Sequence, residues 1–197
     1  RPGLIQLEIG VQTVNPAALR EIKRTMDLDK VEKNVRRIRE YGNIHQHVAL
    51  IAGLPCEDFE SFRGSFDRVY CMEPDQLQLG FLKVLKGSFM AENAGTYDLC
   101  FHGEPPYEVL STRWLDYGDL VKLKTVETMV EAYYNSNQFV HTLKEMGRRW
   151  KSPYAMFQEL GDYYGTRSLH GISHSRLARY EILYDFLKET DPCRIEI

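Results

Sequence analysis

The stretch that decides the fold is VALIAGLPCEDF, residues 48–59. It opens with an apolar run of the kind found in parallel strands that are covered on both faces. The run stops at Gly53-Leu54-Pro55, a stiff and apolar turn, and Asp58 then stands where the N-cap of a helix belongs. Ligands of parallel sheets bind at the carboxyl ends of the strands, so an apolar turn at this place raises the question of what it faces.

Strands and helices alternate on both sides of this stretch. We expect strands at residues 4–10, 47–52 and 76–85. Between them we expect a helix at about 15–24, a helix at about 29–41 in which Asp29 and Glu32 resemble a capping box, and a helix after Asp58. The order strand, helix, helix, strand, helix, strand predicts an α/β fold with a parallel sheet or barrel.

The pattern changes after residue 88. Residues 95–106 are rich in glycine and proline and read as a loop, whereas from Asp116 onward the apolar residues recur at helical spacing. The expected helices span about 116–134, 137–147, 153–164 and 176–188. We therefore expect part of an α/β barrel in residues 1–90 and an all-helical C-terminal domain in residues 91–197.

The composition excludes several classes of protein. Hydrophobic residues make up 43% of the 197 residues and charged residues 27%, which is enough apolar material for a packed core. The net charge of −3 lacks the basic surplus that is typical of nucleic-acid-binding domains. No apolar run approaches the roughly 20 residues of a membrane span and no signal peptide is visible, so we expect a cytoplasmic protein. The cysteines are scattered and are expected to be reduced thiols: Cys56, Cys71, Cys100 and Cys193.

The strand ends carry residues that suit ligand binding, although each end is also compatible with a plain connection. The amide of Gln12 can both donate and accept hydrogen bonds. The turn Gly53-Leu54-Pro55 can present backbone groups to a flat base, and Lys86 and Ser88 supply a cation and a hydroxyl. Glu8 alternates to the same side of its strand as Gln12, and a carboxylate inside a barrel is costly unless it is paired.

Three segments together resemble the second half of the barrel of radical S-adenosylmethionine (SAM) enzymes. They are LEIGVQTVNPAALREIKR (7–24), VALIAGLPCEDFESF (48–62) and LQLGFLKVLKGS (77–88), and they match the fourth, fifth and sixth strands of that (β/α)₆ fold. From Pro74 onward the sequence also resembles the barrel end and helical tail of radical SAM proteins that carry an N-terminal cobalamin-binding domain. The implied fold is a partial barrel of parallel strands four to six, followed by an all-helical extension of unknown function.

The resemblance implies a set of contacts. Gln12 contacts the bound SAM, Arg24 pairs with its carboxylate, and the turn Gly53-Leu54-Pro55, with Ile51 leading into it, lies against the adenine. A guanidinium fork is the geometry that suits a carboxylate. The candidates for further contact to substrate or SAM are Glu8, Lys86 and Ser88, and no catalytic residue is assigned.

The sequence departs from the family pattern in two positions and lacks its cluster motif. Relatives often hold the ribose hydroxyls with an acidic residue where this sequence has Ala49, and glycine is common where it has Cys56. The family's [4Fe–4S] cluster is bound by a CxxxCxxC loop, which this sequence does not contain. No metal site is predicted here either, since His170 and His174 are at helical spacing but are separated by loop-forming residues.

We therefore expect this chain to be the C-terminal part of a longer radical SAM enzyme, inactive by itself. The parent would hold the [4Fe–4S] cluster and a cobalamin domain, and would cleave SAM reductively to a 5′-deoxyadenosyl radical that attacks a substrate, either a small molecule or one of unknown class. Two alternatives stay open. One is a cobalamin-free radical SAM enzyme of the coproporphyrinogen dehydrogenase or methylthiotransferase type, and the other is a non-catalytic module that binds a partner. An exposed barrel edge would also favour a homodimer.

Overall fold

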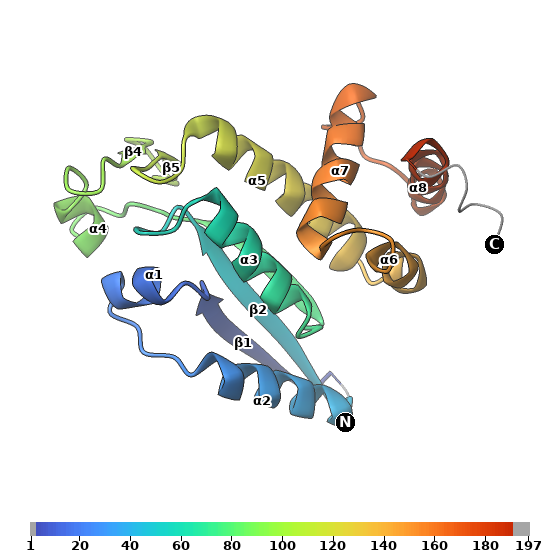
Figure 1. The fold of residues 1–197 in the computed structure, drawn as a ribbon, viewed down its shortest axis with the longest axis horizontal. Coiled ribbons are helices and arrows are strands. Elements are labelled where there is room, and N and C mark those ends of the chain that lie inside the picture. The colour runs from blue at the N-terminus through green and yellow to red at the C-terminus, as the bar shows by residue number, and fades with distance from the viewer. Residues whose placement is uncertain (1–2, 191–197) are drawn as a thin grey trace.

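A three-stranded parallel sheet lies at the centre of the structure, a computed structural model that describes residues 3–190 (Figure 1). The strands lie in the order β1 (Ile5–Gln12), β2 (Ile44–Ala52) and β3 (Gln76–Phe81). Helices α1 (Pro16–Glu21), α2 (Leu28–Tyr41) and α3 (Phe59–Tyr70) connect them. The α/β fold with a parallel sheet is thereby confirmed, and its place as strands four to six of a barrel stays a prediction.

Short polar side chains start each connecting helix. Asn15 Oδ1 accepts a hydrogen bond from the amide of Ala17 at 2.8 Å, and Asp58 Oδ1 accepts one from the amide of Ser61 at 2.9 Å. The predicted capping box at Asp29 is wrong, because Asp27 caps α2 by accepting from the amide of Lys30 at 3.0 Å. The helix therefore begins earlier than its apolar stripe indicates.

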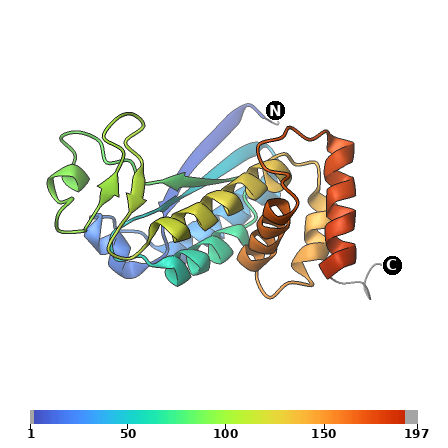
Figure 2. The ribbon, with the colours of Figure 1, turned by 90° about the horizontal axis from the view of Figure 1, so that it is seen from above.

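The two faces of the sheet have different surroundings. One face carries the fully buried side chains of Val48, Leu50 and Leu77, and it packs against α2 and α3, which lie on one side of the sheet (Figure 2). The opposite face carries polar residues in register across all three strands, since Glu8 pairs with His47 and His47 with Gln76. We call this second side the open face, because no helix of the described chain covers its polar row.

The segment after β3 differs from the prediction of a strand at 76–85 and an all-helical extension. β3 ends at Phe81, and the chain then pairs with a later segment: the Val109 amide donates to the Leu82 carbonyl at 2.9 Å, and the Val84 amide to the Tyr107 carbonyl at 2.8 Å. That later segment belongs to an antiparallel strand pair, β4 (Cys100–Phe101) and β5 (Val109–Ser111). A short helix, α4 (Phe89–Glu92), precedes the pair.

The remainder of the chain is helical, as predicted. α5 (Tyr117–Met129) continues through a π-helical turn, η1 (Val130–Tyr134), and is followed by α6 (Val140–Gly147), α7 (Pro153–Thr166) and α8 (Arg176–Thr190). Figures 1 and 2 both place α6 to α8 at the end of the molecule where the strands begin, and the β4–β5 pair at the end where they finish.

One continuous apolar core joins the sheet layer to these helices. Phe66 on α3 contacts Tyr154 and Phe157 on α7, with ring centroids 5.6 and 6.0 Å apart in edge-to-face geometry. Such aromatic pairs are favourable beyond the area that they bury. The division of the chain at residue 90 stays a prediction, because the two parts share this core.

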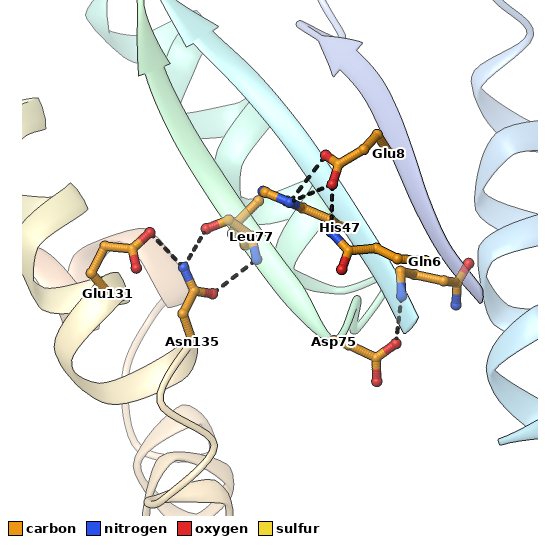
Figure 3. Close-up of polar contacts among 8 residues, drawn as sticks. Gln6, Glu8, His47, Asp75, Leu77, Glu131 and Asn135 are labelled. Atoms are coloured by element: carbon orange, nitrogen blue, oxygen red, sulfur yellow. Dashed lines mark hydrogen bonds and ion pairs between the residues drawn. The ribbon is translucent and has the colours of Figure 1, made fainter. Parts of the chain in front are cut away.

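A side chain from the helical part also pairs with the outer edge of β3. Asn135 accepts from the Leu77 amide and donates to the Leu77 carbonyl, both at 2.9 Å, and it donates to Glu131 at 2.7 Å (Figure 3). The amide thus takes the place of a neighbouring strand at this point. On the other side of the sheet β1 pairs only with β2 among residues 3–190, so the predicted homodimer through an exposed edge stays a prediction.

Residues 191–197, which include Cys193, lie outside the described residues. Within residues 3–190, no helix combines the length and the hydropathy that a bilayer crossing requires.

Candidate functional site

Two predicted contact residues, Gln12 and Arg24, meet over the backbone of Gly10. Nη2 of Arg24 donates to the Gly10 carbonyl at 2.8 Å. A methyl group on Gly10 would lie 2.4 Å from Nε2 of Gln12 and 3.9 Å from Nη2 of Arg24. Arg24 forms no ion pair within residues 3–190, so its remaining N–H groups can bind an anionic ligand.

Local backbone geometry explains why these side chains converge. The register of β1 against β2 shifts between Gly10 and Gln12, and Gln12 has a φ of 70°, a left-handed conformation that is strained for a residue with a side chain. On the other side, α1 ends at Glu21, and the Arg24 amide folds back to the Leu19 carbonyl at 2.8 Å. This register shift in β1 and the tight turn after α1 bring both side chains to Gly10.

The open face next to this carbonyl is lined by small residues. Gly10 pairs in register with Ala49, and Ile51, which is half-buried, pairs with Gly80. A methyl group on Gly80 would come within 3.3 Å of the Leu50 carbonyl and 3.8 Å of the Ile51 side chain. Ile51 is therefore the one predicted contact of its strand that faces this surface, and two of its neighbours there are glycines.

The turn Gly53-Leu54-Pro55 has a reason for its apolar character within the fold itself. All three residues are buried, with Leu54 only 3% exposed. Gly53 has a φ of 90°, and a methyl group there would lie 2.8 Å from Val109 on β5. The turn is thus covered by the strand pair that the sequence pattern missed. The contact of this turn with an adenine stays a prediction, and the backbone groups of the turn would have to make that contact.

A buried carboxylate that sequence reasoning missed holds this turn to its neighbours. Glu57 is fully buried, and its Oε1 accepts from Thr13 Oγ1 at 2.5 Å and from Ser65 Oγ at 2.9 Å. Its Oε2 has no hydrogen-bond partner. Burial raises the pKa of the Glu57 carboxyl from 4.5 to about 7, and the two hydroxyl donors oppose that rise. The end of β1, the turn after β2 and α3 are joined through this one group.

Cys56 has a left-handed backbone with a φ of 64°, a conformation that glycine adopts without steric cost. The Cys56 carbonyl accepts from Asn15 Nδ2 at 2.9 Å, and the same Nδ2 donates to Ser61 at 2.8 Å. These bonds tie the strained turn to the starts of α1 and α3.

Glu8 lies on the open face, where its partner is His47, and its role as a contact to substrate or SAM stays a prediction. Both carboxylate oxygens lie near Nδ1 of His47, at 3.1 and 3.0 Å, and Gln6 donates to Oε1 at 2.5 Å (Figure 3). The His47 side chain is only 14% exposed, and its Nε2 has no partner. Strand alternation could have placed His47 opposite Glu8, but the sequence alone does not give the register between two strands.

Lys86 and Ser88 are not brought together with Gln12 and Arg24. The ammonium group of Lys86 lies 5.5 Å from the centroid of the Tyr107 ring. The Ser88 hydroxyl caps α4 by accepting from the Ala91 amide at 3.3 Å. Neither contact indicates a ligand, so their roles stay predictions.

The described residues, 3–190, contain no group of three or more His, Cys, Asp or Glu side chains arranged to hold a metal ion. The two histidines singled out from the sequence have partners in the protein instead. Nε2 of His170 lies 3.2 Å from the Gly161 carbonyl, and Nε2 of His174 lies 2.9 Å from the Leu169 carbonyl. Both rings also pack on Tyr164.

Comparison with known proteins gives a family match and a structural similarity. A family model described as "Protein of unknown function (DUF4080)" matches residues 95–196. No curated protein matches the chain. A solved structure, coproporphyrinogen III oxidase (HemN) from Escherichia coli, described as a radical SAM enzyme, is similar at 24% identity with a TM-score of 0.48. The match covers 66% of this chain and 27% of that enzyme, so the chain spans about a quarter of the enzyme's length.

Proposed function

This chain belongs to the DUF4080 family, whose function is unknown, and we propose that its sheet layer is the SAM-binding half of a radical SAM barrel. The observation that carries the proposal is the convergence of Gln12 and Arg24 on Gly10, with Arg24 bonded to the Gly10 carbonyl and Gln12 beside its Cα. Two side chains from separate elements, one of them on a strained backbone, converge at the carboxyl end of a parallel strand, where ligands of such sheets bind.

The residues fit the groups of SAM in three ways. The guanidinium of Arg24 is engaged with a carbonyl through Nη2 and has further donors for a carboxylate. The amide of Gln12 lies beside it and offers both a donor and an acceptor. The open face at Gly10, Ala49, Ile51 and Gly80 is apolar and small-sided, which suits the flat adenine. With Ala49 in place of an acid, the ribose hydroxyls would be held by other groups.

In a radical SAM enzyme, the [4Fe–4S] cluster supplies the electron that cleaves SAM to a 5′-deoxyadenosyl radical. Within the proposal, this chain's part is to bind and orient SAM. Arg24 fixes the carboxylate end, Gln12 fixes the adjoining polar groups, and the open face excludes water from one side of the base. The cluster and a cobalamin domain would belong to other parts of the parent protein.

Removal of the Arg24 guanidinium is expected to weaken SAM binding. A hydrogen-bonded charge pair contributes about 1.5–3 kcal/mol, so Arg24→Ala should raise the Kd for SAM at least tenfold, and Gln12→Ala about fivefold. Isothermal titration calorimetry of the chain with SAM measures both effects. Arg20→Ala is the matched control, because Arg20 is exposed in the last turn of α1, one residue before that helix ends. Equal losses in Arg20→Ala and Arg24→Ala, or no SAM binding at all, would contradict the proposal and favour the partner-binding module.

Replacement of Gly10 by alanine separates binding from folding. The new methyl group would overlap Nε2 of Gln12, the far end of a flexible side chain, which can swing away at little energetic cost. We therefore expect Gly10→Ala to change the free energy of unfolding by less than about 1 kcal/mol but to raise the Kd for SAM about fivefold, as Gln12→Ala does. Gly64→Ala is the control, since nothing lies within 4 Å of a methyl group there. An unchanged Kd would show that Gln12 does not need its place over Gly10.

A further inference from the structure

A pocket with a volume of about 300 Å³ adjoins the candidate site. It lies between the C-terminal end of α1 and the segment that follows β3, and its walls include Glu21, Lys23, Lys83, Leu85 and Phe89. The turn that ends α1 contributes a side chain to the candidate site at Gly10 and another to this pocket. Arg24 extends from it to the Gly10 carbonyl, whereas the ammonium group of the preceding Lys23 lies 4.7 Å from the centroid of the Phe89 ring.

Two lysines and one glutamate line this pocket, which leaves a net positive charge, and the lysines lack carboxylate partners. In the part of the chain that the structure describes, neither Lys23 nor Lys83 forms an ion pair. The backbone of Glu108 forms an antiparallel bridge with that of Lys83, but the Glu108 carboxylate forms its ion pair with Lys124. Glu21 also lines the pocket, and its Oε1 accepts from the Tyr97 hydroxyl at 2.5 Å.

The remaining wall of the pocket is apolar and exposed to solvent. Leu85 is 53% exposed and Phe89 is 40% exposed, and Ile22 and Met90 lie beside them. Single exposed apolar side chains are ordinary on protein surfaces, but here two large ones share one concave wall with two ammonium groups. Small-molecule pockets combine an apolar lining with a few placed polar groups in this way.

We propose that this pocket binds an amphipathic carboxylate, with its apolar body against Leu85 and Phe89 and its carboxylate between Lys23 and Lys83. Two ammonium groups match the two oxygens of a carboxylate. The Ser88 hydroxyl lines the same pocket and caps α4 only as an acceptor, so its own O–H can donate a third hydrogen bond to the carboxylate. This ligand is the substrate of the proposed enzyme, because the pocket shares the end of α1 with the SAM contact Arg24. That assignment rests on the proposed function.

Octanoate is the probe, and 1-octanol is its uncharged counterpart. In two-dimensional NMR titrations of the chain, octanoate should give saturable shifts at Ile22, Phe89 and Met90, and 1-octanol should bind at least fivefold more weakly. Lys23→Met and Lys83→Met keep an unbranched apolar side chain and remove the charge. Each should weaken octanoate binding about threefold, the effect of an exposed charge pair, and raised salt should weaken it in the unmodified chain. Lys33→Met, on the exposed side of α2, should leave binding unchanged.

Three results would overturn the proposal: no saturable binding of octanoate, equal binding of octanoate and 1-octanol, or an equal loss in Lys33→Met. The assay contains no SAM, so its outcome is separate from that of the SAM titration. A chain that binds octanoate at this pocket but does not bind SAM would keep the pocket and refute the proposed function. A chain that binds SAM but not octanoate would refute the pocket alone.

Discussion

Gly53→Ala is expected to lower the free energy of unfolding by about 3 kcal/mol. Two costs combine at this position. A residue with a side chain pays about 1–2 kcal/mol in a left-handed conformation, and Gly53 has a φ of 90°. The new methyl group would also lie 2.8 Å from Cγ1 of Val109, and overpacking of a well-packed site costs about 1–3 kcal/mol. Urea denaturation followed by circular dichroism measures the change.

Gly87→Ala is the matched control for the backbone cost alone. Gly87 has a φ of 75°, and nothing lies within 4 Å of a methyl group there, so we expect a loss of about 1 kcal/mol. A double-mutant cycle with Val109→Ala isolates the overlap, because Gly53→Ala should cost about 1–2 kcal/mol less in that background. Equal losses at Gly53 and Gly87 would show that β5 does not pack on the turn.

Local signals predicted most of the fold because they act over a few residues. Asn15, Asp58 and Asp116 each accept from a backbone amide at the start of a predicted helix, and such caps need no distant partner. The strand pair β4–β5 was missed, because strands of two and three residues show no periodicity and the bond from Val109 to Leu82 joins backbone groups. The cover that Val109 gives to the apolar turn was therefore missed, and the contact of that turn with an adenine stays a prediction.

The candidate site was predictable as a set of residues but not as an arrangement. Gln12 and Arg24 were predicted from the resemblance of motifs. Their meeting at Gly10 depends on a strand bulge and on a left-handed backbone, which the sequence pattern does not predict. Glu57 and His47 were missed for a related reason. Burial and partners decide their roles, and both depend on which segments lie across from them in the fold.

Glu57→Gln is expected to remove a pH-dependent loss of stability. The pKa of Glu57 is about 7 in the folded chain and its ordinary value is 4.5, so the folded chain holds this proton more tightly than the unfolded chain. The stabilisation that the protonated carboxyl gives is fully present below about pH 4.5 and is lost as the pH rises through 7. At about 1.4 kcal/mol per pKa unit, the loss at pH 8 is on the order of 3 kcal/mol.

Glutamine mimics the protonated carboxyl, because it keeps an acceptor for Thr13 and Ser65 and carries no charge. The variant should therefore match the unmodified chain at pH 5 and exceed its free energy of unfolding by about 2–3 kcal/mol at pH 8, in urea denaturation at both pH values. Glu104→Gln, at an exposed position, corrects for the loss of one negative charge and should leave the pH dependence unchanged. If Glu57→Gln were instead less stable than the unmodified chain at pH 8, the carboxylate would be ionised and satisfied in the fold. Oε2 would then have a partner, and the turn after β2 would be held by charge and not by two neutral hydrogen bonds.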